Sequence, residues 1–161
     1  MARPPEIREP GLPSEWHDSS LIHFTWDPVK ECASAVVSTP DDTRYGQNLW
    51  LIEMTGVLRI EMETLGSGEP TESPQPPEAY EIDASRSSEE ALRWKKRLRT
   101  LGVRGDVLEV CFVSSYLRGW GERSSLGGFT VICRAVRTDY APKEFKGREF
   151  FRPFIPAGRE G

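Results

Sequence analysis

The fold is decided between residues 106 and 138, which read DVLEVCFVSSYLRGWGERSSLGGFTVICRAVRT. Residues 106–115 are nearly all apolar, which is typical of a central strand covered on both faces. Residues 129–138 are their predicted antiparallel partner, because the stretch between them is a glycine-rich loop and a parallel pair would need a crossover. The two segments therefore predict a hairpin in an antiparallel sheet.

One amphipathic helix precedes this hairpin and is predicted over 88–101. Ser87 with Glu90 fits a capping box at its start, and Gly102 suits its C-terminal cap. Apolar residues recur at three- and four-residue spacing, at Ala91, Trp94, Leu98 and Leu101. A helix followed by a hairpin indicates an α+β fold, since a doubly wound parallel sheet needs repeated helical crossovers.

Three stretches upstream have strand character. Residues 21–26 alternate, with Ile22, Phe24 and Trp26 on one face and Leu21, His23 and Thr25 on the other. Residues 32–38 and 49–65 follow, and Gly56 interrupts the longer one, where a bent strand and two separate strands are both open. We predict a mainly antiparallel sheet of about five or six strands, twisted or partly closed, with the helix packed on one face.

Proline-rich segments flank the predicted domain. We expect residues 1–20 to form an irregular arm, residues 21–140 to form one α+β domain, and residues 141–161 to form an extended tail. Within the domain, residues 66–79 contain four prolines and no aliphatic anchor, which predicts an exposed loop.

Composition narrows the class of protein. The 161 residues carry 25 acidic and 21 basic side chains, and this formal charge of -4 argues against a domain that mainly neutralises phosphates. No run approaches the ~18 apolar residues of a membrane span, and the N-terminus lacks the apolar run of a secretion signal. We therefore expect a cytoplasmic protein without a membrane partner.

Three cysteines, Cys32, Cys111 and Cys133, are too few for a disulfide framework. Cys111 and Cys133 lie on the two strands of the predicted hairpin and would face each other in a symmetric register. Buried cysteines mostly act as small apolar side chains, so reduced thiols are the expected state.

No motif with a catalytic spacing is present, neither a phosphate-binding loop nor a zinc or nucleophile signature. His17 beside Asp18 is better explained as a surface histidine. The carboxylates Glu53, Glu61 and Glu63 could share one sheet face and exchange protons or bind a cation, but they are better explained as a solvated strand face paired with arginines. The sequence thus indicates no cofactor and no metal site, and it favours a non-enzymatic role.

Two basic surfaces are candidate sites for a protein partner. The helix offers Arg93, Lys96 and Arg97. The loop 117–128 offers Arg118, Trp120 and Arg123, and tryptophan and arginine dominate interface hot spots. We expect a non-catalytic protein-binding module, such as an inhibitor, an immunity-type factor or an accessory subunit.

Two other functions remain open. A curved sheet could enclose a small-ligand or enzymatic pocket lined by His23, Trp26, Trp50 and Tyr116, whereas a filled sheet interior would argue against it. The basic helix and the Arg/Trp loop could instead contact RNA, which the acidic net charge makes the least favoured of the three.

Overall fold

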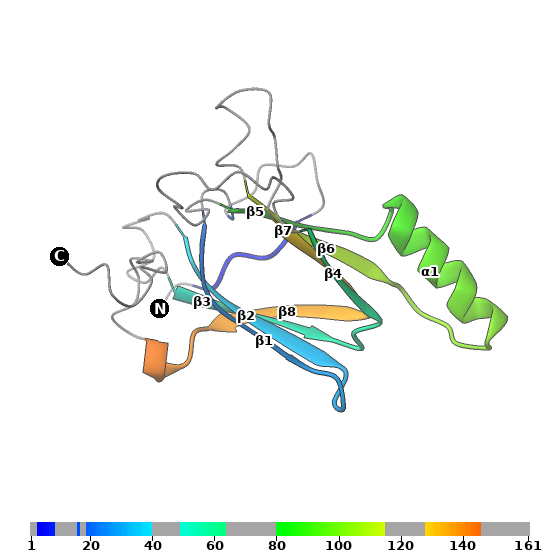
Figure 1. Cartoon of the computed structure of the whole chain (residues 1–161), viewed down its shortest axis with the longest axis horizontal. Helices are drawn as coiled ribbons and strands as arrows, with labels where there is room; N and C mark the ends of the chain where they lie inside the picture. The colour runs from blue at the N-terminus through cyan, green and yellow to red at the C-terminus, as the bar shows by residue number, and fades with distance from the viewer. Residues whose placement is uncertain are drawn as a thin grey trace, which may run out of the picture.

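The computed structural model describes residues 3–8, 16, 19–39, 49–63, 80–114 and 128–145 (Figure 1). Within these ranges the elements are β1 (Ser20–Asp27), β2 (Cys32–Ser38), β3 (Leu49–Thr55), β4 (Arg59–Glu63), β5 (Tyr80–Ser85), α1 (Glu89–Thr100), β6 (Leu108–Ser114), β7 (Gly128–Cys133), β8 (Ala135–Tyr140) and the 3-10 helix η1 (Lys143–Phe145). Their strand pairs are all antiparallel, which confirms the predicted α+β class.

The strands form two four-stranded sheets instead of the single sheet of five or six strands that the sequence predicts. The first sheet has the order β1-β2-β3-β8, and the second sheet has the order β4-β7-β6-β5. The structure has more strands than predicted because two extended segments are each divided into two strands, one in each sheet. β3 is followed by β4, and β7 is followed by β8 (Figure 1).

The two bends meet at Gly56 and Arg134. The amide of Arg134 donates to the carbonyl of Thr55 at 3.0 Å, and the amide of Leu58 donates to the carbonyl of Ile132 at 2.7 Å. Gly56 has a φ of 64°, and a Cβ at this position would lie 2.8 Å from the Cβ of Arg134. Of the two options that the sequence left open, two separate strands is therefore the correct one, because β3 and β4 belong to different sheets, and glycine is required at the corner between them.

Alternate residues of both sheets fill the space between them. Phe112 of β6 lies opposite Phe129 of β7, as the hairpin prediction requires, and their rings stack at 4.3 Å. Trp50 and Ile52 enter from the first sheet and are buried with them. The outward side chains of β6 are only partly buried, so this strand is not covered on both faces as predicted.

A bulge in β1 corrects the predicted facing of its first residues. Leu21 pairs with Val37 and His23 pairs with Val36, so Ile22 is an extra residue in this strand. Leu21 consequently packs in the core with Phe24, whereas Ile22 packs on the outer face of the sheet. Simple alternation cannot detect this shift, because a bulge moves residues to the other face.

Helix α1 begins one residue later than the predicted capping box. Its N-cap is Ser88, whose Oγ accepts a hydrogen bond from the amide of Ala91 at 3.2 Å. Ser87 is turned instead toward Ser85, with 3.3 Å between the two hydroxyl oxygens. The N-cap interaction therefore belongs to the second serine of the pair.

The C-terminus of α1 follows the glycine prediction. Leu101 is the C-cap, and Gly102 follows it with a φ of 78°. The amide of Gly102 donates to the carbonyl of Arg99 at 3.0 Å, and the amide of Val103 donates to the carbonyl of Leu98 at 2.9 Å. This pair of hydrogen bonds is the Schellman arrangement, which favours glycine.

Both flanking segments contribute packing. Trp16 is fully buried in the core, although the sequence predicts only an irregular arm there. Residues 3–8 have no regular secondary structure, and the carbonyl of Arg8 accepts a hydrogen bond from Ala84 of the edge strand β5 at 3.2 Å. On the opposite side, Phe145 of η1 packs against Val36 and Leu49 on the outer face of the first sheet.

Candidate functional site

Helix α1 is an insertion in a strand connection. Strands β5 and β6 are adjacent and antiparallel, and residues 86–107 connect them. Such a connection usually takes two to five residues, so the sheet itself does not require a helix here. Figure 1 shows α1 beyond the ends of the strands, at the edge of the molecule.

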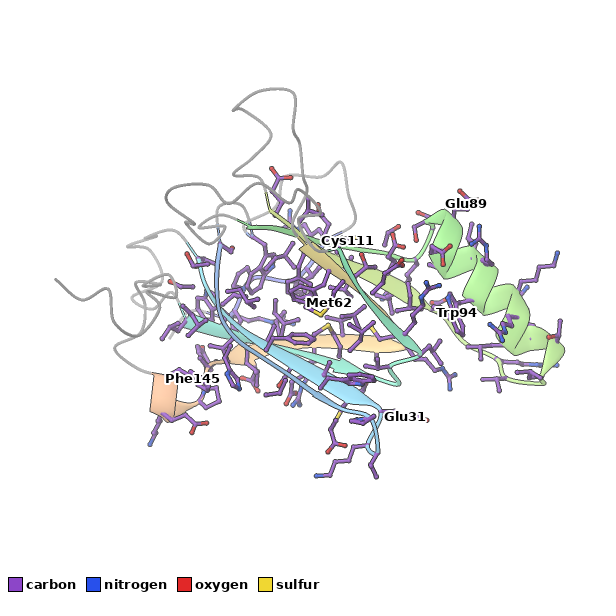
Figure 2. All side chains as sticks on the ribbon, in the orientation of Figure 1. Glu31, Met62, Glu89, Trp94, Cys111 and Phe145 are labelled. Atoms are coloured by element: carbon purple, nitrogen blue, oxygen red, sulfur yellow. The ribbon has the colours of Figure 1, made fainter. Side chains whose placement is uncertain are left out.

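A narrow apolar stripe attaches α1 to the second sheet. Ala91 is fully buried and forms a cluster with Val107 and Ile132. Trp94, Leu98 and Leu58 are partly buried against this cluster, and Trp94 lies on the side of α1 that faces the strands (Figure 2). The rest of the helix surface is consequently open to solvent.

The solvent side of α1 carries what we call the outer stripe, which consists of Leu92, Lys96 and Arg99. These residues are spaced i, i+4 and i+7 and therefore share one face. The side chain of Leu92 is 51% exposed. Among the residues that the structure describes, no carboxylate forms an ion pair with Lys96 or Arg99. The outer stripe thus combines an exposed apolar side chain with two cations.

Several other cations of α1 are already engaged. Arg93 pairs with Glu89 at 3.2 Å and also with Glu90. The guanidinium of Arg97 lies 5.1 Å from the ring of Trp94, a cation-π distance. Of the three helical residues predicted to contact a partner, Lys96 lies on the outer stripe, whereas Arg93 and Arg97 flank it.

Lys95 links α1 to the loop before β6. Its Nζ donates to Asp106 at 2.9 Å, and this hydrogen bond is the main reason why the pKa of Asp106 is lowered, with further contributions from Arg86 and Arg99. Asp106 is exposed, so the pair orients the helix end without adding much stability.

Four of the predicted site residues lie outside the described part of the chain. They are Tyr116, Arg118, Trp120 and Arg123. His17 and Asp18 lie outside it as well.

The three described residues of the predicted pocket occupy separate environments. Trp50 is buried between the sheets, where its Nε1 donates to the hydroxyl of Thr39 at 3.0 Å. Trp26 is 54% exposed on the edge strand β1, and His23 lies on the outer face with its ring 5.2 Å from that of Phe145. These three side chains thus lie in different places in the described part of the chain, with only Trp50 among the apolar side chains buried between the sheets.

The carboxylates considered for proton exchange or cation binding are separated too. Glu53 pairs with Arg137 across β3 and β8, which raises the pKa of Arg137. Glu61 lies on the second sheet, 3.4 Å from Arg59. Glu53 and Glu61 both fit the predicted solvated strand faces. The side chain of Glu63 lies outside the part of the chain that the structure describes.

The two hairpin cysteines lie on opposite faces of the second sheet. Cys111 pairs with Thr130 and is only partly buried, whereas Cys133 pairs with Leu108 and is buried in the core. Burial raises the pKa of Cys111 to about 11 and that of Cys133 to about 12, with Glu109 as a second cause for Cys111. Both thiols are free, as expected, because the register does not make them opposite.

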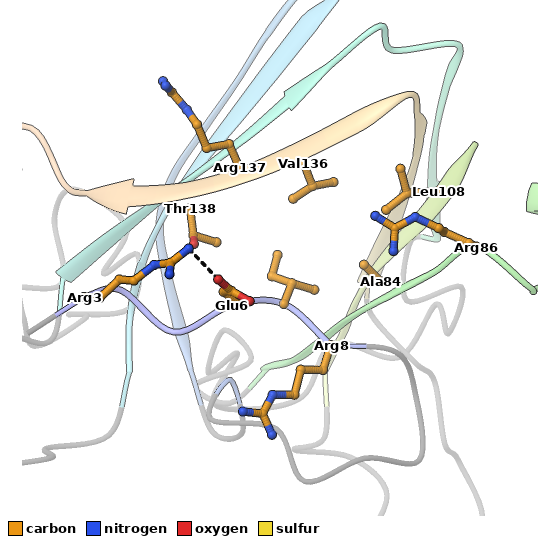
Figure 3. Close-up of a pocket in the computed structure, with 10 residues that line it drawn as sticks. Arg3, Glu6, Arg8, Ala84, Arg86, Leu108, Val136, Arg137 and Thr138 are labelled. Carbon is orange, nitrogen blue, oxygen red and sulfur yellow. Dashed lines mark ion pairs between the residues drawn. The ribbon is translucent and has the colours of Figure 1, made fainter. Parts of the chain in front are cut away.

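A cavity that the sequence did not predict lies where β8 diverges from β6. Its volume is about 440 Å³, and residues 3–8 of the N-terminal arm form one wall (Figure 3). Arg3, Glu6, Ile7, Arg8, Ala84, Arg86, Leu108, Val136, Arg137 and Thr138 line it. The only local signal was the apolar Ile7 within a charged, proline-rich arm, and that signal does not reveal which strands the arm contacts.

Within the described ranges, no three histidine, cysteine or acidic side chains are grouped to hold a metal ion, and no helix has the length and apolar character to cross a membrane. Comparison of the chain with family models, curated proteins and solved structures finds no match.

Proposed function

We propose that the protein is a non-catalytic binding module that docks another protein through the outer stripe of α1. The observation that carries the proposal is the helix itself: it is inserted where the sheet needs only a turn, and it exposes Leu92 on the same face as the cations Lys96 and Arg99. Amphipathic helices commonly bind partners through anchors spaced i, i+4 and i+7.

The chemistry of the outer stripe defines the partner surface. Lys96 and Arg99 favour carboxylates on the partner, and Leu92 favours a shallow apolar groove beside them. A polyanion such as RNA is less suitable, because the outer face of the neighbouring second sheet carries Glu81, Asp83 and Glu109.

Charge reversal on the stripe tests this proposal. We expect tagged wild-type protein to retain a stoichiometric protein from extract of its own cells at low salt and to release it as salt rises. The double variant Lys96→Glu/Arg99→Glu should lose that protein, because both attractive contacts become repulsive.

The matched control is Lys30→Glu/Lys143→Glu, which makes the same charge change at exposed positions away from α1. This control should retain the partner. Equal retention by both double variants, or capture that nuclease treatment removes, would contradict docking of a protein through α1.

A further inference from the structure

The cavity beside the N-terminal arm has a structural cause. At Arg134 the chain leaves β7 of the second sheet and enters β8 of the first, so the sheets diverge on this side. The arm spans the opening and is anchored by the hydrogen bond between Arg8 and Ala84. Backbone from three separate parts of the chain thus encloses one space of about 440 Å³, within the size range of small-molecule sites.

Apolar side chains form the floor of this cavity. Leu108 and Ala84 come from the second sheet, Val136 comes from β8, and Ile7 comes from the arm. Ala84, Leu108 and Val136 surround the same space in Figure 3. A ligand with an apolar body would remove this surface from water, which is favourable in proportion to the area covered.

The rim of the cavity is cationic. Four arginines and a single carboxylate, Glu6, are among the lining residues. Glu6 pairs with Arg3 at 2.5 Å, and Arg137 points away toward Glu53 (Figure 3). Arg8 and Arg86 line the cavity near β5, and Arg8 has no ion pair within the described residues.

Arg86 is the cation best placed for a ligand. Its guanidinium extends over the cavity (Figure 3), 3.7 Å from Asp106, whose nearer partner is Lys95 at 2.9 Å. A guanidinium has five N–H donors in a planar fork, so Arg86 can bind a ligand carboxylate in addition to the partners that it already has.

We infer that the cavity binds a small amphipathic carboxylate, with its acid group at Arg86 and its apolar body over Ile7, Leu108 and Val136. The inference is independent of the proposed role of α1, because no residue of the outer stripe lines the cavity.

Calorimetric titration of the full chain with decanoate tests the inference. We expect one saturable site for decanoate. Decanol should bind at least tenfold more weakly because it lacks the charge. Inorganic phosphate should not compete with decanoate because it lacks the apolar body. Arg86→Gln should weaken decanoate at least tenfold, and Val136→Phe should abolish binding by filling the cavity.

Lys30→Gln is the matched control, because it removes one positive charge at an exposed position outside the cavity and should leave decanoate binding unchanged. Thermal unfolding establishes whether Val136→Phe folds; if it does not, the exposed Arg86→Gln variant decides alone. Absence of saturable binding, equal affinity for decanol, or unchanged binding in Arg86→Gln would overturn the inference.

Discussion

Gly56 and Arg134 lie at the corner at which the chain passes from one sheet to the other, between β3 and β4 and between β7 and β8. The backbone of Gly56 is left-handed, and the space for a Cβ is already taken by the Cβ of Arg134. The glycine was visible in the sequence as a break in alternation. The bend at Arg134 could not be predicted from the sequence, because neither glycine nor proline marks it. Only the contact with the neighbouring segment around Gly56 imposes this corner.

We predict that Gly56→Ala costs roughly 2–4 kcal/mol of unfolding free energy, from left-handed strain together with the steric overlap. Gly102→Ala is the control, since Gly102 also has a positive φ but no atom lies within 4 Å of its added Cβ. It should cost only about 1 kcal/mol. Urea unfolding measures both, and equal losses would mean that the corner is not tightly packed.

The buried thiol of Cys133 predicts a pH dependence of stability. Its pKa in the folded protein is raised from 9.0 to about 12, so the folded chain keeps this proton at pH values where the unfolded chain loses it. The associated stability is fully present below pH 9 and is lost as the pH rises toward 12.

Cys133→Ala removes this titration, so its stability should fall less than that of the wild type between pH 7 and pH 10.5. The loss of unfolding free energy in the wild type should exceed that in Cys133→Ala by about 1 kcal/mol for each pH unit above pH 9. Urea unfolding at the two pH values measures it. Parallel losses in both proteins would show that the thiol is not desolvated.

At the scale of elements, α1 was predicted well because its signals are local. The apolar spacing and Gly102 identified the helix and its end, and the hairpin of β6 and β7 followed from signals that are equally local, an apolar run and the glycine-rich loop after it. The β1 bulge was missed because a single unpaired residue is determined by pairing with β2 and leaves no distinct pattern in the sequence.

The two adjacent serines before α1 provide a test at this scale. Ser88→Ala should cost about 1 kcal/mol, because the Ala91 amide loses its acceptor. Ser87→Ala, at the position that sequence alone favours, should cost clearly less. Urea unfolding of the two variants measures both losses of unfolding free energy. A greater loss in Ser87→Ala than in Ser88→Ala would show that Ser87 is the N-cap.

At the scale of the whole molecule, the arrangement of the sheets depends on contacts between distant parts of the chain. Trp16 and Phe145 come from segments that the sequence described as an arm and a tail, yet both are buried. The cavity was missed for the same reason, since its lining comes from the N-terminal arm, from both β5 and β6, and from β8, and no local pattern unites these segments.

The charge is also organised at this scale. The protein is acidic overall, yet α1 presents Lys96 and Arg99 while the outer face of the second sheet presents Glu81, Asp83 and Glu109. Net charge alone therefore does not single out the surface that we propose as the docking site. The insertion of α1 into a strand connection is the feature that distinguishes this surface.

Site-specific photo-crosslinking in the protein's own cells tests docking through α1 most directly. A crosslinking residue at Leu92, on the outer stripe, is compared with one at Val29, which is 91% exposed in the turn between β1 and β2. We predict one dominant protein adduct from position 92, absent from position 29 and lost when Lys96→Glu/Arg99→Glu is added. The same adducts from both positions, or an adduct from position 92 that persists after charge reversal, would contradict the account.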